Sequence, residues 1–261
     1  METGVDKRRG ALYSALGLIG VVALWWIGTL TFLSEVRIPS PDGVIRSLVQ
    51  DGFAFYWPHF SVTIHEAALG FFWGNLAAIL LASVVLVLPW TERLITQIAV
   101  ISYCIPIVAV APVLFIVIGA PSTGEPSGTA VALAVLAVFF TTVVGTLLGL
   151  KSADAASLDV VTVYGGNRLT QLRKVRAIAA LPSVLNALQI AAPAALLGAI
   201  LGEYVGGVRQ GVGLALMIAQ TNLDVERAWA LGLLCAAVAG AAYAAFGLIG
   251  RLLTPWSKGG A

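Results

Sequence analysis

The chain has 261 residues, of which 59% are hydrophobic and only 11% are charged. This leaves too little polar surface to coat a soluble globule, so the composition excludes a soluble globular protein and predicts one whose solvent is a lipid bilayer. The formal net charge is only +2, so the positions of the charged residues are more informative than their sum.

Six stretches of at least 23 residues contain no Asp, Glu, Lys or Arg. A helix needs about 20 apolar residues to cross a hydrocarbon core about 30 Å thick, so each stretch is long enough to span. They predict an all-α membrane protein with six transmembrane helices, built as a single domain over residues 1–261. The predicted spans lie near residues 11–33, 67–91, 94–118, 128–150, 181–202 and 228–250.

The basic residues predict the orientation of these spans. If the N-terminus is cytoplasmic, 11 of the 15 Lys and Arg residues fall in cytoplasmic segments, which the positive-inside rule favours. They include Lys7, Arg8 and Arg9, which precede an apolar run too long for the core of a signal peptide. We therefore expect a retained first helix and cytoplasmic N- and C-termini.

The segment between the first and second predicted spans, residues 34–66, opens with the Ile-Pro-Ser-Pro run at 38–41, which fixes an extended start. Its aromatic side chains are typical of a membrane-interface belt, although a binding role is the alternative. His59 and His65 have no third ligand nearby in the sequence, so we interpret them as interface histidines and not as metal ligands. The aromatic residues are Phe53, Phe55, Tyr56, Trp57 and Phe60.

The third predicted span contains Pro106 and Pro112, and glycines recur four residues apart in several other spans, as in Gly198 and Gly202. Small residues at this spacing let helix backbones approach closely. Two interpretations remain open: simple packing within one bundle, or a kinked bundle that lines a path and can rearrange.

Residues 210–223 form a charge-free stretch that is too short to span and predicts a re-entrant or interfacial helix. Glu203 comes just before it, at the expected outer end of the fifth span. This carboxylate is either a solvated helix-end group or a gate or partner contact. The same alternatives stay open for Glu66, just before the second span.

The only sizeable cytoplasmic segment between spans runs from Lys151 to Arg176. Gly165 and Gly166 interrupt it, and Asn167 is suited to cap a following amphipathic helix. The pattern predicts a helix, a glycine turn and a second helix within a coupling loop at residues 151–180, which could contact a cytoplasmic partner.

This loop resembles that of the permease subunits of ATP-binding-cassette (ABC) importers, in the branch that serves nitrate, sulfonate, taurine and related solutes. That family's loop carries Glu-Ala-Ala, then Gly, then Ile-x-Leu-Pro; here Asp159-Val160-Val161, Gly165 and Val175-x-Ala177-Ile178 stand for the three elements. Other parts of the chain resemble the branch, in the same order. They are the 38–41 run, the Gly-Phe pair at 70–71, the prolines of the third span, and Glu203 followed by Gly-Val-Gly-Leu at 211–214. Glu66 departs from it, because the family commonly has Arg there.

The resemblance implies a permease subunit of the bacterial inner membrane that forms the path for a small solute and is not an enzyme. The sequence contains no phosphate-binding Gly-x-x-x-x-Gly-Lys motif, so we expect ATP and Mg on a partner ATPase and no cofactor on this chain. By resemblance, the expected partners are two ATPase subunits, a second and identical permease copy, an extracytoplasmic substrate-binding protein and membrane lipid, with no nucleic acid. The implied ATPase-coupling residues are Asp159, Thr162, Gly165, Gly166, Asn167 and Arg168, and the candidates for the path or gate are Pro106, Pro112, Glu203, Gly211 and Gly213.

Two other functions fit the physical features alone. One is a secondary transporter or channel that works without ATP, although no evident inverted repeat or charge within the spans supports it. The other is a non-transporting scaffold subunit of a membrane complex. The solute stays open among nitrate, a sulfonate, taurine, a vitamin precursor or an aromatic acid.

Overall fold

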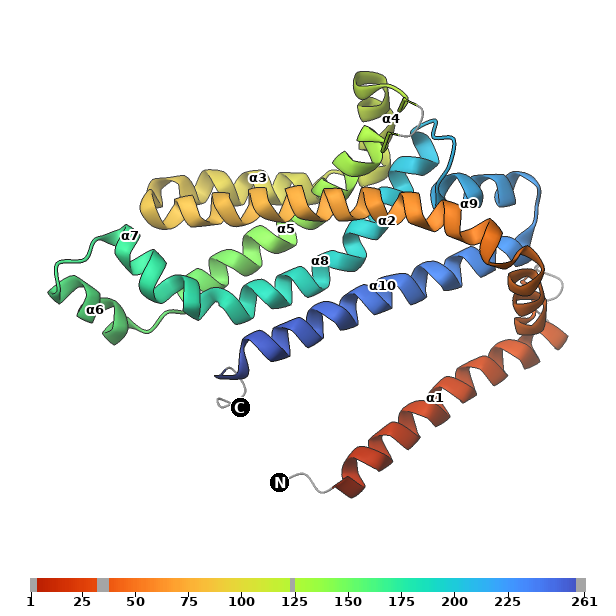
Figure 1. Cartoon of the computed structure of the whole chain (residues 1–261), viewed down its shortest axis with the longest axis horizontal. Coiled ribbons are helices and arrows are strands. Elements are labelled where there is room, and N and C mark those ends of the chain that lie inside the picture. The colour runs from red at the N-terminus through yellow and green to blue at the C-terminus, as the bar shows by residue number, and fades with distance from the viewer. Residues whose placement is uncertain (1–3, 32–37, 123–124, 257–261) are drawn as a thin grey trace. The chain divides into compact units, whose positions relative to one another are not determined.

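A computed structural model describes residues 4–31, 38–122 and 125–256 (Figure 1). These residues are almost entirely helical and contain no strand, which confirms the predicted all-α class. The side chains of Lys7, Arg8 and Arg9 and the whole of Lys258, which entered the orientation argument, lie outside the described part. The α-helices are α1 (Gly4–Thr31), α2 (Pro41–Val87), α3 (Glu92–Cys104), α4 (Ile107–Ile118), α5 (Gly128–Lys151), α6 (Ala155–Val163), α7 (Arg168–Gln171), α8 (Ala177–Val205), α9 (Val212–Thr221) and α10 (Val225–Leu253).

Four helical stretches among the described residues are long and apolar enough to cross a membrane: α2, α5, residues 168–205 and α10. A fifth is obtained if α3 and α4, with the short 3₁₀ turn Pro89–Thr91 before them, count as one span. The apolar stretch Ile19–Thr31 of α1 is shorter than a membrane span. The count of six spans therefore stays a prediction, and so does the single domain.

The third predicted span is divided into two helices. α3 ends at Cys104, Ile105 is extended, and Pro106 precedes the first residue of α4. The two helices are bent by 96°. Proline disfavours a helical conformation in the residue before it and has no N–H to continue the helix, so Pro106 separates α3 from α4. Pro112 lies inside α4.

α2 contains a conformational break near its start. Residues 38–40 of the run that was predicted to be extended belong to no helix, and α2 begins at Pro41. Gly52 then adopts φ 64° and ψ 177°, which disfavours residues with a side chain and interrupts the helix. The apolar part of α2 follows this break.

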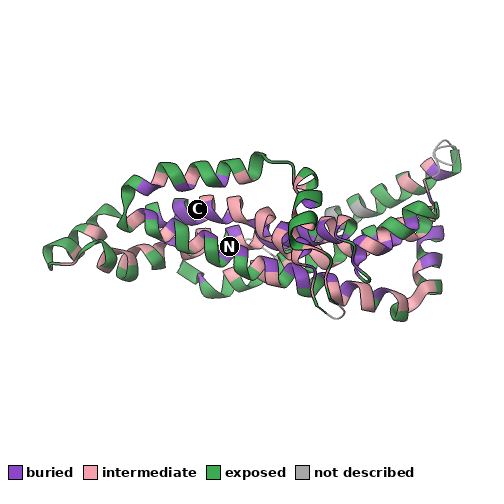
Figure 2. Cartoon of the chain, turned by 90° about the horizontal axis from the view of Figure 1, so that it is seen from above, coloured by how far each residue is buried: buried purple, intermediate pink, exposed green. Residues whose placement is uncertain are grey.

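The described chain divides into two compact units. One consists of residues 1–56 and 216–234, and the other of residues 57–215 and 235–261. In the second unit α5 and α8 run side by side (Figure 1). The buried residues there are mostly small, and Figure 2 shows them as purple segments among ribbons that are otherwise exposed or half-buried.

Glycines bring the backbones of α5 and α8 together, as the sequence predicted. A Cβ atom at Gly202 would lie 2.3 Å from Ala130 Cα, and one at Gly198 would lie 2.7 Å from Leu133 O. From the other helix, a Cβ at Gly149 would lie 2.9 Å from Ala180 O. Lipid tails are as apolar as the side chains, so helices in a bilayer are held together largely by such close packing.

We expect Gly202→Leu to separate α8 from α5, because the new side chain has backbone atoms in its way. Overpacking of this kind costs about 1–3 kcal/mol or more, so the melting temperature of the purified chain in detergent should fall clearly. Gly240→Leu on α10 is the matched control, since a Cβ there meets no atom within 4 Å. Equal melting temperatures for the two variants would contradict the packing argument.

Candidate functional site

Glu203, near the end of α8, is buried and fully engaged in hydrogen bonds. Its residue surface is only 2% exposed. Oε1 accepts a bond from Thr63 Oγ1 at 2.6 Å, and Oε2 accepts one from the Gly213 N–H at 2.7 Å. The interpretation of Glu203 as a solvated helix-end carboxylate is therefore wrong, because α2 and the start of α9 cover it.

Glu66, on α2, is buried beside Glu203. It is 1% exposed, and its Oε1 accepts the backbone N–H of Ser127 at 2.6 Å, at the N-terminus of α5. The two carboxyl groups lie within hydrogen-bonding reach of each other. Glu66 Oε2 has no hydrogen-bond donor among the described residues. We call Thr63, Glu66, Ser127, Glu203 and Gly213 the carboxyl cluster.

The glycines predicted for this site are required by its geometry. Gly211 has φ 147°, and a Cβ there would lie 2.5 Å from Glu203 Cδ; a Cβ at Gly213 would lie 2.4 Å from the carbonyl oxygen of Ile200. The structure thus brings together three of the five predicted path residues: Glu203, Gly211 and Gly213. The other two, Pro106 and Pro112, belong to the α3–α4 bend and to α4.

Further polar contacts hold the start of α9 against α2. The Val212 N–H donates to Thr63 Oγ1 at 2.9 Å, and His59 Nδ1 lies 2.9 Å from Gly211 O. His59 therefore contacts the backbone of a segment that is distant in the sequence. The interpretation of His59 as an interface residue did not predict this contact. Within the described residues no group of three His, Cys, Asp or Glu side chains is arranged to hold a metal ion.

A cavity of about 410 Å³ lies beside Glu66. Its lining carries side chains of both charge signs, from α2, from the segment before α5 and from the segment after α8. The charged and polar lining residues include Ser61, His65, Glu66, Glu125, Arg209 and Gln210.

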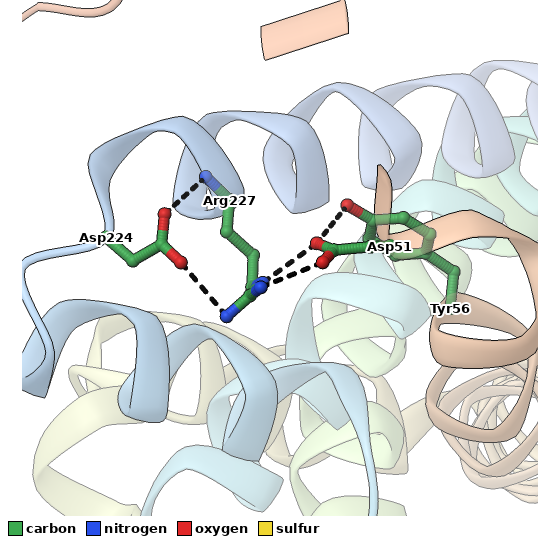
Figure 3. Close-up of polar contacts among 4 residues, drawn as sticks. All are labelled: Asp51, Tyr56, Asp224 and Arg227. Carbon is green, nitrogen blue, oxygen red and sulfur yellow. Dashed lines mark hydrogen bonds and ion pairs between the residues drawn. The ribbon is translucent and has the colours of Figure 1, made fainter. Parts of the chain in front are cut away.

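A second polar group, which the sequence analysis missed, lies in the other unit. Arg227 Nε and Nη2 each lie 2.8 Å from an oxygen of Asp51, and Arg227 Nη1 lies 2.9 Å from Asp224 (Figure 3). The Tyr56 hydroxyl donates to Asp51 Oδ2 at 3.1 Å. Tyr56 thus completes an ion-pair network in addition to any interfacial role. Asp51 and Arg227 are 176 residues apart, so nothing local in the sequence indicates the pair.

Asp51 precedes the break in α2 and lies outside the apolar part of that helix. The bonds from Arg227 hold the pKa of its carboxyl below the usual value, against the opposing effect of burial. A lowered carboxyl pKa means that the ionised group stabilises the fold above about pH 4, and that this contribution is lost as the pH falls below that range.

We expect Asp51→Asn to destabilise the chain by about 1–3 kcal/mol at neutral pH, because the Arg227 guanidinium loses its bidentate partner. Asp42→Asn is the control, since Asp42 pairs with Arg46 at 3.7 Å on an exposed surface, where such pairs contribute less than about 1 kcal/mol. Melting in detergent would measure both. The difference between native and Asp51→Asn should shrink below about pH 4; a difference that grows there would contradict the assignment.

The predicted coupling loop is structured as expected. α6 is followed by a turn in which Gly165 has φ 78° and a Cβ at Gly166 would lie 2.8 Å from Val161 O. Asn167 caps α7, its side chain accepting the Thr170 N–H at 2.9 Å. The prediction of a helix, a glycine turn and an Asn-capped helix is confirmed.

The tip of this loop exposes apolar side chains that the sequence analysis did not single out. Val163 is 83% exposed and Tyr164 is 87% exposed, directly before the glycine turn. Five of the six predicted coupling residues are also exposed, namely Asp159, Thr162, Gly165, Asn167 and Arg168.

Comparison with known proteins identifies the family. The model of the family described as binding-protein-dependent transport system inner membrane component matches residues 74–258. The chain therefore belongs to this family of ABC importer permeases.

Individual relatives agree with this assignment. A protein of Haemophilus influenzae named Probable ABC transporter permease protein is 30% identical, over 82% of this chain and 86% of its own length. The formylaminopyrimidine transport permease protein ThiX of Halalkalibacterium halodurans is 26% identical, over 95% of this chain and 97% of its own length. The taurine transport system permease protein TauC of Escherichia coli is 24% identical, over 93% and 89%.

The chain is thus a multi-pass inner-membrane permease subunit of an ABC importer for a small solute, and it is not an enzyme. ATP hydrolysis belongs to a separate ATPase subunit, and the family works with a substrate-binding protein. This decides against the ATP-independent transporter or channel, and against the scaffold, that composition alone left open.

Proposed function

We propose that residues 155–171, which we call the coupling segment, dock onto the ATPase subunit and pass its movement to the membrane helices. The observation that carries the proposal is the exposed apolar tip at Val163 and Tyr164 on an ordered hairpin. Exposed apolar side chains on such a tip are typical of a protein contact surface.

Hydrogen bonds within the coupling segment support a rigid element. Gln171 Nε2 donates to Thr162 Oγ1 at 3.0 Å, and the Gly166 N–H donates to Val161 O at 2.8 Å. In this proposal Thr162, Gly165, Gly166 and Asn167 set the shape of the segment. Asp159 and Arg168 then offer exposed charges to the ATPase surface.

The connection to the membrane helices is short. The π-helical turn Leu172–Arg176 joins α7 directly to α8. Arg176 Nη1 donates to Leu150 O at 2.9 Å, and Lys151 pairs with Glu92 at the start of α3. A displacement of the coupling segment therefore acts on α5 and α8 together, which is the mechanical link that an ATP-driven change of access requires.

The assembly that we propose contains two permease copies, two ATPase subunits that bind ATP and Mg, and an extracytoplasmic substrate-binding protein. The N- and C-termini and the coupling segment face the cytoplasm, as the basic residues predict. We propose that the second permease copy is identical to the first, as the resemblance to the family implies.

For the solute we propose a small polar molecule of the kinds named for the relatives, which are a formylaminopyrimidine and taurine. We place its path near Glu203, Gly211 and Gly213, with Pro106 and Pro112 in the bent pair as the hinge. The solute can be identified by isolating the substrate-binding protein that co-purifies with the chain and measuring which solute it binds.

We expect Tyr164→Asp to weaken docking, because a carboxylate at the tip must lose its hydration in an apolar contact. The amount of ATPase subunit that co-purifies with the tagged chain in mild detergent should fall at least about tenfold, an amount that corresponds to about 1.4 kcal/mol. ATP-driven solute uptake in reconstituted vesicles should fall with it.

Trp256→Asp is the control for this experiment, since Trp256 is another exposed aromatic residue, outside the coupling segment. It should leave the ATPase stoichiometry unchanged. Native stoichiometry and uptake in Tyr164→Asp would show that the tip is not the docking surface.

A further inference from the structure

The hydrogen bonds of the carboxyl cluster do not balance if both acids are ionised. An ionised carboxylate only accepts hydrogen bonds. Glu203 has a donor on each oxygen and Glu66 has one on Oε1, but Glu66 Oε2 has none among the described residues. A buried acceptor without a donor costs free energy, and the Glu66 side chain lies beside a second carboxyl group, that of Glu203.

The charges do not balance either. Two ionised carboxylates in contact in a buried site repel each other, and each loses its hydration. None of the ion pairs among the described residues involves Glu66 or Glu203. The surroundings of the pair suit one negative charge. Two backbone N–H groups donate to the carboxyl groups, that of Ser127 at the N-terminus of α5 and that of Gly213 at the N-terminus of α9.

We propose that Glu66 and Glu203 form a single-proton site that holds the start of α9 on α2 and α8. The proton is on Glu66 Oε2, which then donates to Glu203. Glu66 still accepts the Ser127 N–H, and Glu203 carries the negative charge with three donors around it. One proton therefore satisfies every polar atom of the two side chains.

The titratable and charged groups around the pair come from several segments. His59 and His65 lie on α2, Glu125 before α5, Arg209 after α8 and Cys235 on α10. His65, Glu125 and Arg209 are exposed and line the cavity that reaches Glu66. This polar cavity gives water, and hence protons, a route to the buried pair.

The attachment of the start of α9 to α2 and α8 therefore depends on protonation of the pair. The Gly213 N–H at the start of α9 donates to Glu203 Oε2. Thr63 Oγ1 donates to Glu203 Oε1 and accepts the Val212 N–H. Loss of the proton leaves two negative charges in contact beneath α9, and the repulsion loosens this attachment. The site does not depend on the docking proposal, and its test needs neither ATPase nor solute.

The test compares the full-length chain with Glu66→Gln in mild detergent, from about pH 6 to about pH 9. The substituted amide still accepts from Ser127 and donates to Glu203, but it cannot release a proton. Native folded chain holds a proton that the unfolded chain lacks. As long as the folded pair keeps its proton, the unfolding equilibrium constant of the native chain should therefore rise about tenfold per pH unit relative to that of Glu66→Gln, and this rise should stop once the proton is released. At the alkaline end Glu66→Gln should melt at a higher temperature than native.

Two further variants complete the experiment. Glu125→Gln removes an exposed carboxylate that lines the same cavity, and it should keep the native pH profile. Glu203→Gln should also lose the pH-dependent component, because it removes one of the two carboxyl groups that share the proton. Parallel profiles for native and Glu66→Gln would overturn the proposal. So would a native profile that changes when metal ions are chelated, because a cation would then occupy the place of the proton.

Discussion

The close packing of α5 against α8 is the constraint on which the rest of the second unit depends. Gly198 and Gly202 let the two backbones approach until no Cβ fits between them. In a bilayer this contact replaces the hydrophobic effect that would hold the helices together in water. The coupling segment leads into the start of α8, and the carboxyl cluster uses the end of α8 and the start of α5. One rigid pair therefore connects both features.

Local signals in the sequence predicted the features that local chemistry determines. Residues 128–150 were expected to span and α5 covers Gly128–Lys151, because a long charge-free run needs no distant partner to become a helix. The coupling segment followed from Gly165, Gly166 and Asn167, since a positive φ and a helix cap are properties of a few adjacent residues. The short apolar helix predicted within residues 210–223 is α9.

The contacts that the sequence did not indicate join residues far apart in the chain. Thr63 and Glu203 are 140 residues apart, and Asp51 and Arg227 are 176 apart. A single sequence carries no information on such pairing, so Glu203 was consistent with a solvated group and Tyr56 with an interface belt. The exposed tip at Val163 and Tyr164 was missed for a different reason: apolar residues next to a glycine turn look the same whether they are covered or exposed.

Glu66 shows how one departure from a family pattern changes the physics of a shared site. The resemblance implies Arg at this position, and an Arg facing Glu203 would neutralise it as a permanent cation at every physiological pH. A carboxyl group in the same place can join Glu203 only by keeping a proton. In this chain the glycines that pack on Glu203 are required by the close approach of the backbone, whichever charge lies at position 66. The glycines therefore account for the shape of the cluster, whereas the response to pH that we propose follows from Glu66.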